Sequence, residues 1–398
     1  MEFRIYLNLL SFRMIRLIAV FLFLLSPLLS NIKVLPGFSW GDLAVLFFLV
    51  WFLTSRRSLS LNSWVALGVV AFFAFFVLIY KLIFFNVGYF PALRMLFYIS
   101  CLAILLDGFR SEGLMRQIAL LYMGLSVLFA VLLVLQVFLY KFFGVVFVYL
   151  ETPYDIEVNS VRSLGVEAYG MRTGGVFKEP SYYVIYMFPA LFYAANSKKI
   201  VLWSFFSVSI ILSTSALGFL FVVVTFYSFF ADRKSFLALA LLLSSMVFVF
   251  CYSFGFFPSR VAETIAGGGS LAVRLFDPFL YLFRNLNDFV FPGLGRLDTQ
   301  AVSWLNSLSY IFVLFGISGG LLLLLLLLLS GGVAWFALLL LFLTNSLTNP
   351  YFLVVMLLVK HFSRPVAFSS SVVRGCRKRN SLTRSPLKSP ALSCGLSY

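Results

Sequence analysis

Charged side chains are scarce in this sequence, and their scarcity excludes a soluble globular domain. Only 11% of the 398 residues are charged, whereas 62% are apolar and the mean hydropathy is +1.04. Soluble domains average about 25% charged and about 45–50% apolar residues. Apolar runs of about 17–25 residues, long enough to cross roughly 30 Å of hydrocarbon, recur from end to end. We therefore expect an all-α integral membrane protein.

Histidine and cysteine are also rare, which excludes the usual metal sites. The single histidine, His361, directly follows the last apolar run. Cys101 and Cys251 fall in apolar runs, and Cys376 and Cys394 fall in the basic C-terminal tail, without the spacing of metal ligands. We expect no metal and no cofactor.

Acidic residues number 14 against 30 basic ones, which gives a formal net charge of +16. Such a balance is common in nucleic-acid-binding proteins, but here most basic residues lie in short loops and in the tail. The excess of Lys and Arg in the cytoplasmic loops of membrane proteins explains this distribution without a nucleic-acid partner. Arg4, Arg13 and Arg16 precede the first apolar run and indicate an uncleaved signal anchor.

About twelve apolar segments are candidate membrane spans. With the N-terminus in the cytoplasm, that side holds nineteen Lys and Arg against four acids, and the rest of the chain holds eleven against ten. This asymmetry is the one that orients membrane helices. We expect a multi-pass protein of the bacterial inner membrane, with both termini cytoplasmic and spans near 17–30, 41–54, 63–85, 92–106, 117–139, 181–196, 200–213, 215–230, 236–257, 304–330, 332–345 and 346–360.

One long apolar stretch decides whether the number of membrane crossings is even or odd. Residues 200–230 would measure about 46 Å as a single helix at ~1.5 Å rise per residue, and one crossing would separate the basic pairs at 198–199 and 233–234. A break at the Ser-Thr-Ser sequence of residues 213–215 keeps both pairs on the cytoplasmic side. Ser and Thr can satisfy the backbone groups that such a break frees. We therefore predict two short helices.

Two large loops then face the periplasm, at about 150–180 and 258–303, within one polytopic domain of residues 1–360. All acids between positions 151 and 179, and between 263 and 298, fall in these loops. The tail, 361–398, is rich in Ser, Arg, Lys and Pro with few large apolar residues. We expect it to be disordered and cytoplasmic.

The first large loop ends in the sequence R-T-G-G-V-F-K-E-P-S, from Arg172 to Ser181. Arg172 carries a planar fork suited to phosphate or carboxylate oxygens, and the two glycines allow close backbone approach or positive φ. Glu179, directly before Pro180, is expected near the positive end of the following helix. A structural role stays open, in which Glu179 caps the helix and pairs with Arg172.

In the second loop, Asp277-Pro278 is typical of a helix N-cap followed by the first helical position. Apolar residues then recur at helical spacing to about residue 290, with Tyr281 and Arg284 on the opposite face. We predict an amphipathic helix lying in the membrane interface. Such a helix beside several arginines suits an anionic lipid-linked substrate, and it also suits ordinary loop packing.

Three sequence motifs follow one another along the chain. The segment that begins at Arg172 comes first, and Arg274 follows, nineteen residues ahead of Gly293-Leu294-Gly295. Asn306 then opens a span that carries glycines at 316, 319 and 320. In order and spacing, and with the broken pair of helices, these motifs resemble the O-antigen polymerase and ligase superfamily over about residues 120–358. Wzy-type polysaccharide polymerases are members of that superfamily.

The resemblance implies a GT-C-like glycosyltransferase that polymerises undecaprenyl-diphosphate-linked oligosaccharide repeat units at the periplasmic face, for lipopolysaccharide O-antigen, capsule or exopolysaccharide. Arg172 and Arg274 would stabilise the diphosphate leaving group, and Glu179 would act as the base, with Asp298 and Glu167 as the alternatives. Membrane lipids and a chain-length regulator protein are the implied partners. Further residues expected to bind substrate are Arg260, Arg284, Arg296, Asp298, Asn306 and Tyr182.

Leu305 departs from the family pattern, because the ligase branch has a histidine at that position which is thought to act in transfer. No predicted periplasmic loop contains a histidine, so we favour a polymerase over a ligase-type glycan transferase. A transporter or flippase of lipid-linked oligosaccharides is the rival from another class. It would show intramembrane charge pairs and inverted repeats, and Lys81 and Arg94 are the ionisable residues that we find within the spans.

Overall fold

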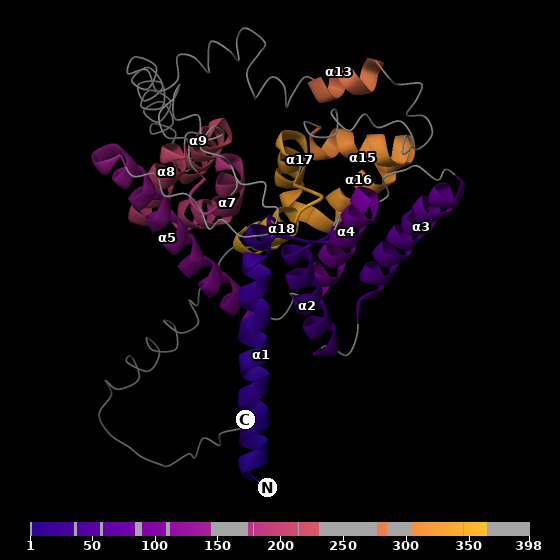
Figure 1. Ribbon diagram of the computed structural model, residues 1–398, viewed down its shortest axis with the longest axis horizontal. Helices are drawn as coiled ribbons and strands as arrows, with labels where there is room; N and C mark the ends of the chain where they lie inside the picture. The colour runs from indigo at the N-terminus through magenta and orange to yellow at the C-terminus, as the bar shows by residue number, and fades with distance from the viewer. Residues whose placement is uncertain are drawn as a thin grey trace, which may run out of the picture. The chain divides into compact units, whose positions relative to one another are not determined.

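The computed structural model describes residues 2–35, 38–55, 59–83, 90–108, 112–144, 174–177, 179–213, 215–230, 277–284, 305–344 and 346–363. These residues are mostly helical, as predicted (Figure 1). The helices are α1 (Glu2–Leu29), α2 (Trp40–Thr54), α3 (Leu61–Ile83), α4 (Phe90–Gly108), α5 (Glu112–Phe143), α7 (Pro180–Asn196), α8 (Ile200–Leu212), α9 (Ala216–Phe230), α13 (Asp277–Arg284), α15 (Ser307–Phe315), α16 (Gly319–Ser330), α17 (Ala334–Leu343) and α18 (Pro350–Phe362), with 3-10 turns η3 (Gly316–Ser318) and η4 (Gly331–Val333).

Among the described residues, three apolar segments are long enough to cross a membrane, by length and composition: Leu61–Ile79, Gly113–Phe143 and Ser307–Leu343. On α3, Trp64, Phe72 and Phe75 are each more than 60% exposed, while Phe73 and Val77 on its other face are buried. Large apolar side chains exposed in this number suit hydrocarbon better than water. The predicted span at 236–257 lies outside the described residues.

A small β-hairpin between α1 and α2 departs from the all-α prediction. Its strands, β1 (Lys33–Leu35) and β2 (Phe38–Ser39), pair antiparallel, and the Trp40 N–H donates to the Ile32 carbonyl at 2.9 Å. The two helices pack closely along each other, with the Phe23 and Phe48 rings stacked at 4.3 Å. The chain must therefore reverse within a few residues, and a two-stranded ladder satisfies its backbone groups there.

The break predicted at residues 213–215 is confirmed, because α8 ends at Leu212 and α9 begins at Ala216. Trp203 Nε1 donates to Thr225 Oγ1 at 3.2 Å, although about 33 Å would separate these residues in one straight helix. Gly218 packs directly against Ile210. Both pairs are centred on residue 214, so α8 and α9 form an antiparallel hairpin.

The segment 307–343 does not cross as one helix. The Ser307 N–H donates to the Thr344 carbonyl at 2.8 Å, so its two ends meet, whereas a straight helix of this length would separate them by about 55 Å. Gly331, with φ +58°, lies at the predicted boundary between two spans. The break at Gly316, with φ +60°, was not predicted and corrects the single span expected over 304–330. An apolar run that continues through Ile317 gives no sign of it.

Helices α7 and α18 lie at the centre of the unit Met1–Ser363. Ten consecutive residues of α18, from Pro350 to Val359, are buried. α7 contacts α5, α8, α9 and α18, and 13 of its residues are buried. These two helices therefore hold the first residues of α7, where the predicted site begins, in a packed environment.

Candidate functional site

Glu179 lies at the start of α7, on a turn that both glycines of the predicted segment build. Gly175 has φ +66°, which favours glycine over residues with a Cβ atom. A Cβ on Gly174 would lie 2.7 Å from the backbone carbonyl carbon and oxygen of Glu179. The Phe177 N–H closes the turn by donating to the Gly174 carbonyl at 3.2 Å. Close approach and positive φ, the two properties predicted for these glycines, are thus both present.

Phe177 anchors this turn in an aromatic cluster. Its side chain is 1% exposed, and its ring lies 5.3 Å from that of Phe129 on α5, 5.1 Å from Tyr186 on α7 and 6.3 Å from Tyr351 on α18. Aromatic pairs at such distances are stabilising in tilted and edge-to-face arrangements. Three helices therefore fix the position of the residue two places ahead of Glu179.

The Glu179 carboxylate is not used as a side-chain cap of α7. Glu179 occupies the N-cap position with extended φ and ψ of −135° and 150°, but its side chain makes no capping hydrogen bond. Its backbone carbonyl accepts from the N–H groups of Tyr182 and Tyr183 at 3.1 and 3.2 Å. Ser181 Oγ donates to Glu179 Oε2 at 3.0 Å. A half-buried carboxylate and a hydroxyl thus share the positive end of the helix, where they can accept or relay a proton.

Tyr182, a predicted substrate-binding residue, stacks on Tyr351 with ring centroids 4.9 Å apart and planes at 18°. The pair brings the beginnings of α7 and α18 together. Tyr182 is half-buried, and one face of its ring is covered by Tyr351. Its predicted part in binding sugar stays a prediction.

Asn306 has a structural role. It is 2% exposed, and its Oδ1 accepts from the Ser309 N–H at 2.8 Å as the N-cap of α15. Next to it, Ser307 Oγ accepts from the Leu347 N–H at 3.1 Å. Asn306 therefore caps α15, Ser307 links the beginning of α15 to the residues just ahead of α18, and the expected contact of Asn306 with substrate stays a prediction.

The arginines of the predicted site are not placed. The helix predicted to begin at Asp277 is confirmed as α13, which contacts α15, but the side chain of its last residue, Arg284, is not described. Residues 285–290 of the predicted helix lie outside the described residues, as do Glu167, Arg172, Arg260, Arg274, Arg296 and Asp298. The described part of the predicted site is therefore Glu179, Tyr182 and Asn306, together with Ser181, which donates to Glu179.

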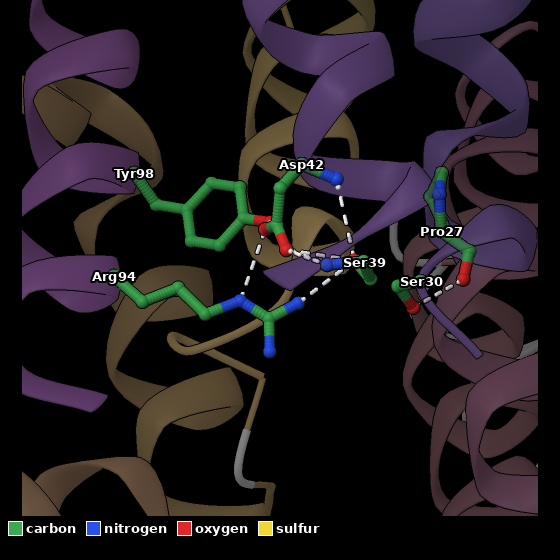
Figure 2. A network of polar contacts seen from close by, with 6 residues as sticks. All are labelled: Pro27, Ser30, Ser39, Asp42, Arg94 and Tyr98. Carbon is green, nitrogen blue, oxygen red and sulfur yellow. Dashed lines mark hydrogen bonds and ion pairs between the residues drawn. The ribbon is translucent and has the colours of Figure 1, made fainter. Parts of the chain in front are cut away.

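A buried polar network between α2 and α4 was missed by sequence reasoning (Figure 2). Arg94 Nε donates to Asp42 Oδ1 at 2.9 Å, and Arg94 Nη2 donates to Ser39 Oγ at 3.1 Å. Tyr98 OH donates to the same Asp42 oxygen. Ser39 and Asp42 form a capping box at the start of α2, in which Asp42 Oδ2 accepts from the Ser39 N–H and Oγ, each at 2.7 Å.

Two signals could have pointed to this network. Ser39 and Asp42 have the spacing of a capping box ahead of an apolar run, and Asp42 is the only acid between Glu2 and Asp107. Arg94 is an ionisable residue within a predicted span. That it meets a residue 52 positions away depends on the packing of α2 beside α4, which local sequence patterns do not encode.

Within the described ranges, no three His, Cys, Asp or Glu side chains gather as a group that could hold a metal ion. Comparison with known proteins adds no identity, since no family model, no curated protein and no solved structure matches this chain.

Proposed function

We propose that this chain is a multi-pass glycosyltransferase of the bacterial inner membrane. It polymerises oligosaccharide repeat units linked to undecaprenyl diphosphate, at the periplasmic face. The observation that carries the proposal is the turn of residues 174–179 directly before α7. Its glycines and Phe177 hold Glu179 and Ser181 at a helix start, in the segment that begins with Arg172 and resembles the superfamily.

Membrane placement is supported by the long apolar segments Leu61–Ile79 and Gly113–Phe143, by the folded-back apolar segment Ser307–Leu343 and by large exposed apolar side chains. The antiparallel hairpin of α8 and α9 supports an even number of crossings between residues 200 and 230. The beginnings of α7, α15 and α18 gather near one another. If α7, α18 and the helical segment that α15 opens cross the membrane, those beginnings lie at one face, which we assign to the periplasm by the positive-inside rule.

In the proposed reaction, an acceptor sugar hydroxyl attacks the anomeric carbon of the donor chain. The new oxygen–carbon bond forms as the bond between that carbon and the diphosphate breaks, and undecaprenyl diphosphate leaves. Glu179 takes the hydroxyl proton. Arg172 and Arg274 stabilise the charge that develops on the diphosphate, a role in which losing one preorganised donor costs about 10²–10³ in rate.

The test is complementation in a host that lacks its own polymerase. Glu179→Gln, Arg172→Ala and Arg274→Ala should each leave one repeat unit on lipid A instead of a ladder, at unchanged protein level. Lys33→Gln, a change at an exposed residue of β1, serves as the control and should keep the ladder. A normal ladder from Glu179→Gln would remove Glu179 as the base.

A transporter of lipid-linked oligosaccharides is the second candidate, and the Asp42–Arg94 ion pair is the observation that favours it. Charged pairs inside membrane segments often mark transport pathways. The phenotypes differ: loss of a polymerase leaves one repeat unit per lipid A core, whereas loss of a transporter leaves no repeat unit at the surface. Loss of a ligase-type transferase also removes all surface glycan.

A further inference from the structure

The guanidinium of Arg94 has one edge turned into the protein and one turned out. Its inner edge, Nε and Nη2, donates to Asp42 and Ser39. The remaining nitrogen, Nη1, points away from both residues in Figure 2. The Arg94 side chain is 23% exposed, whereas that of Asp42 is 2% exposed. The inner edge is therefore fixed, and the outer edge remains accessible.

The Asp42 carboxylate does not need the outer donors of Arg94. Its Oδ2 accepts two hydrogen bonds from Ser39, and its Oδ1 accepts from Arg94 Nε and from Tyr98 OH. Arginine has five N–H donors, of which this network uses two. The network thus satisfies the buried carboxylate and, at the same time, sets the orientation of the guanidinium plane.

We propose that the outer edge of Arg94 binds a phosphate group at the membrane surface. The Nη1–Nη2 edge of a guanidinium matches two oxygens of a phosphate. Ser39 is the N-cap of α2 and Arg94 is the fifth residue of α4, so the site lies near the positive ends of two helices, which favour an anion. Asp42 neutralises the net charge of Arg94, and binding therefore depends on the geometry of the fork.

This inference rests on the membrane placement within the proposed function, because a phosphate at this level is offered by lipids. Two sources share the chemistry: the headgroup of an anionic phospholipid and the diphosphate of a lipid-linked sugar donor. They are distinguished by the lipid chain and by the number of phosphates.

The experiment measures binding to the purified full-length protein in detergent. The probes are phosphatidylglycerol, farnesyl diphosphate and, as the phosphate-free reference, diacylglycerol. Arg94→Lys keeps the charge but removes the fork, and Arg94→Gln removes both. Each should weaken binding of at least one phosphate probe about tenfold, the loss expected for a charge-assisted hydrogen bond, and leave diacylglycerol binding unchanged. Lys33→Gln removes an exposed charge from the hairpin just ahead of α2 and should change none of the three.

Loss of phosphatidylglycerol binding alone assigns the site to a lipid headgroup, loss of farnesyl diphosphate binding alone assigns it to the donor, and loss of both supports a site that accepts either. Unchanged affinities in folded Arg94→Lys would overturn the proposal. Equal affinity of the unaltered protein for phosphatidylglycerol and diacylglycerol, with no binding of farnesyl diphosphate, would also overturn it, even if the variants fail to fold. Phosphate binding does not require polymerisation. If the protein binds the phosphate probes but does not restore the glycan ladder, the proposed polymerase function is rejected and the phosphate site is kept.

Discussion

Gly174, Gly175 and Phe177 each have a folding reason to be where they are. Gly174 touches the Glu179 carbonyl group, Gly175 has a positive φ, and Phe177 fills an aromatic cluster. The Glu179 side chain makes no capping hydrogen bond to α7. The sequence motif predicted that Glu179 lies at the start of a helix. It did not predict that its carboxylate would bond to Ser181.

Alanine at either glycine should disturb the turn while leaving most of the fold intact. Gly174→Ala places a Cβ atom against the Glu179 backbone, and Gly175→Ala forces a left-handed alanine, which costs about 1–2 kcal/mol. We expect both to shorten the glycan ladder in complementation, with a modest fall in the thermal unfolding midpoint in detergent. Gly124→Ala, at an exposed helical position of α5 with open space around it, is the matched control. A full ladder from Gly174→Ala would show that the turn does not position the reacting group.

Asp42→Asn should destabilise the packing of α2 against α4. The asparagine amide would turn an N–H₂ group toward the donors of Ser39, Arg94 or Tyr98. We expect a loss of about 1–3 kcal/mol, since Arg94 keeps some contact with solvent. The thermal midpoint measures this, with Lys33→Gln as the control. In the double variant Asp42→Asn/Arg94→Gln the two losses should not add, because the partner left unpaired is also gone. Strict additivity would mean that the two residues are not coupled.

Among the elements, the two breaks in long apolar runs differ in how far they could be predicted. The break at residues 213–215 was foreseen, because three consecutive hydroxyl side chains interrupt the run and charge counting required a reversal. The break at Gly316 was not foreseen, since glycine is common in membrane helices and the residues on both sides are apolar. Its reason is tertiary: Gly319 lies so close to the Ile311 backbone that an added Cβ would be 2.8 Å from the Ile311 carbonyl oxygen, and only a sharp turn permits this approach.

A disulfide can test the α8–α9 hairpin. In a variant whose native cysteines are replaced by alanine, Ile210→Cys and Gly218→Cys should oxidise to a disulfide. A Cβ on Gly218 would lie 2.7 Å from Ile210 Cγ2, so the two Cβ atoms fall within the roughly 3.5–4.5 Å of natural disulfides. Thiol mass-tagging measures the reaction as a loss of two reactive thiols. The control pairs Ile210→Cys with Leu220→Cys, at a position 37% exposed. No oxidation of the first pair would favour one straight helix, in which about 12 Å separates residues 210 and 218.

At the scale of the whole molecule, helix positions followed from apolar runs, while the pairing of helices did not. Where the structure describes them, the predicted spans fall on helices, but the span expected over 304–330 is two helices, α15 and α16, and α1 and α5 extend beyond their predicted limits. Contacts such as Tyr182 with Tyr351 join residues far apart in sequence. Such contacts depend on side-chain shape across helices, which a single sequence does not reveal. The number of crossings stays a prediction.

Labelling of single cysteines in intact cells and after lysis would count those crossings. With a membrane-impermeant maleimide, Lys33→Cys and Thr348→Cys should react in intact spheroplasts, because both lie in turns assigned to the periplasm. Ser55→Cys, Lys198→Cys and Ser363→Cys should react only after lysis.

Thr348→Cys and Ser363→Cys, at the two ends of α18, are the most informative of these variants, because hydrogen bonds already place each end of α18 beside another helix. Lys360 Nζ donates to the Leu329 carbonyl at 2.6 Å, so the last turn of α18 lies beside the end of α16, whereas its first residues lie beside the start of α15. If Thr348→Cys and Ser363→Cys react from the same side, α18 does not cross the membrane, and the prediction of an even total number of crossings is wrong. If they react from opposite sides while Lys33→Cys and Thr348→Cys share the periplasmic side, the segments between residues 33 and 348 cross an even number of times, as charge counting requires.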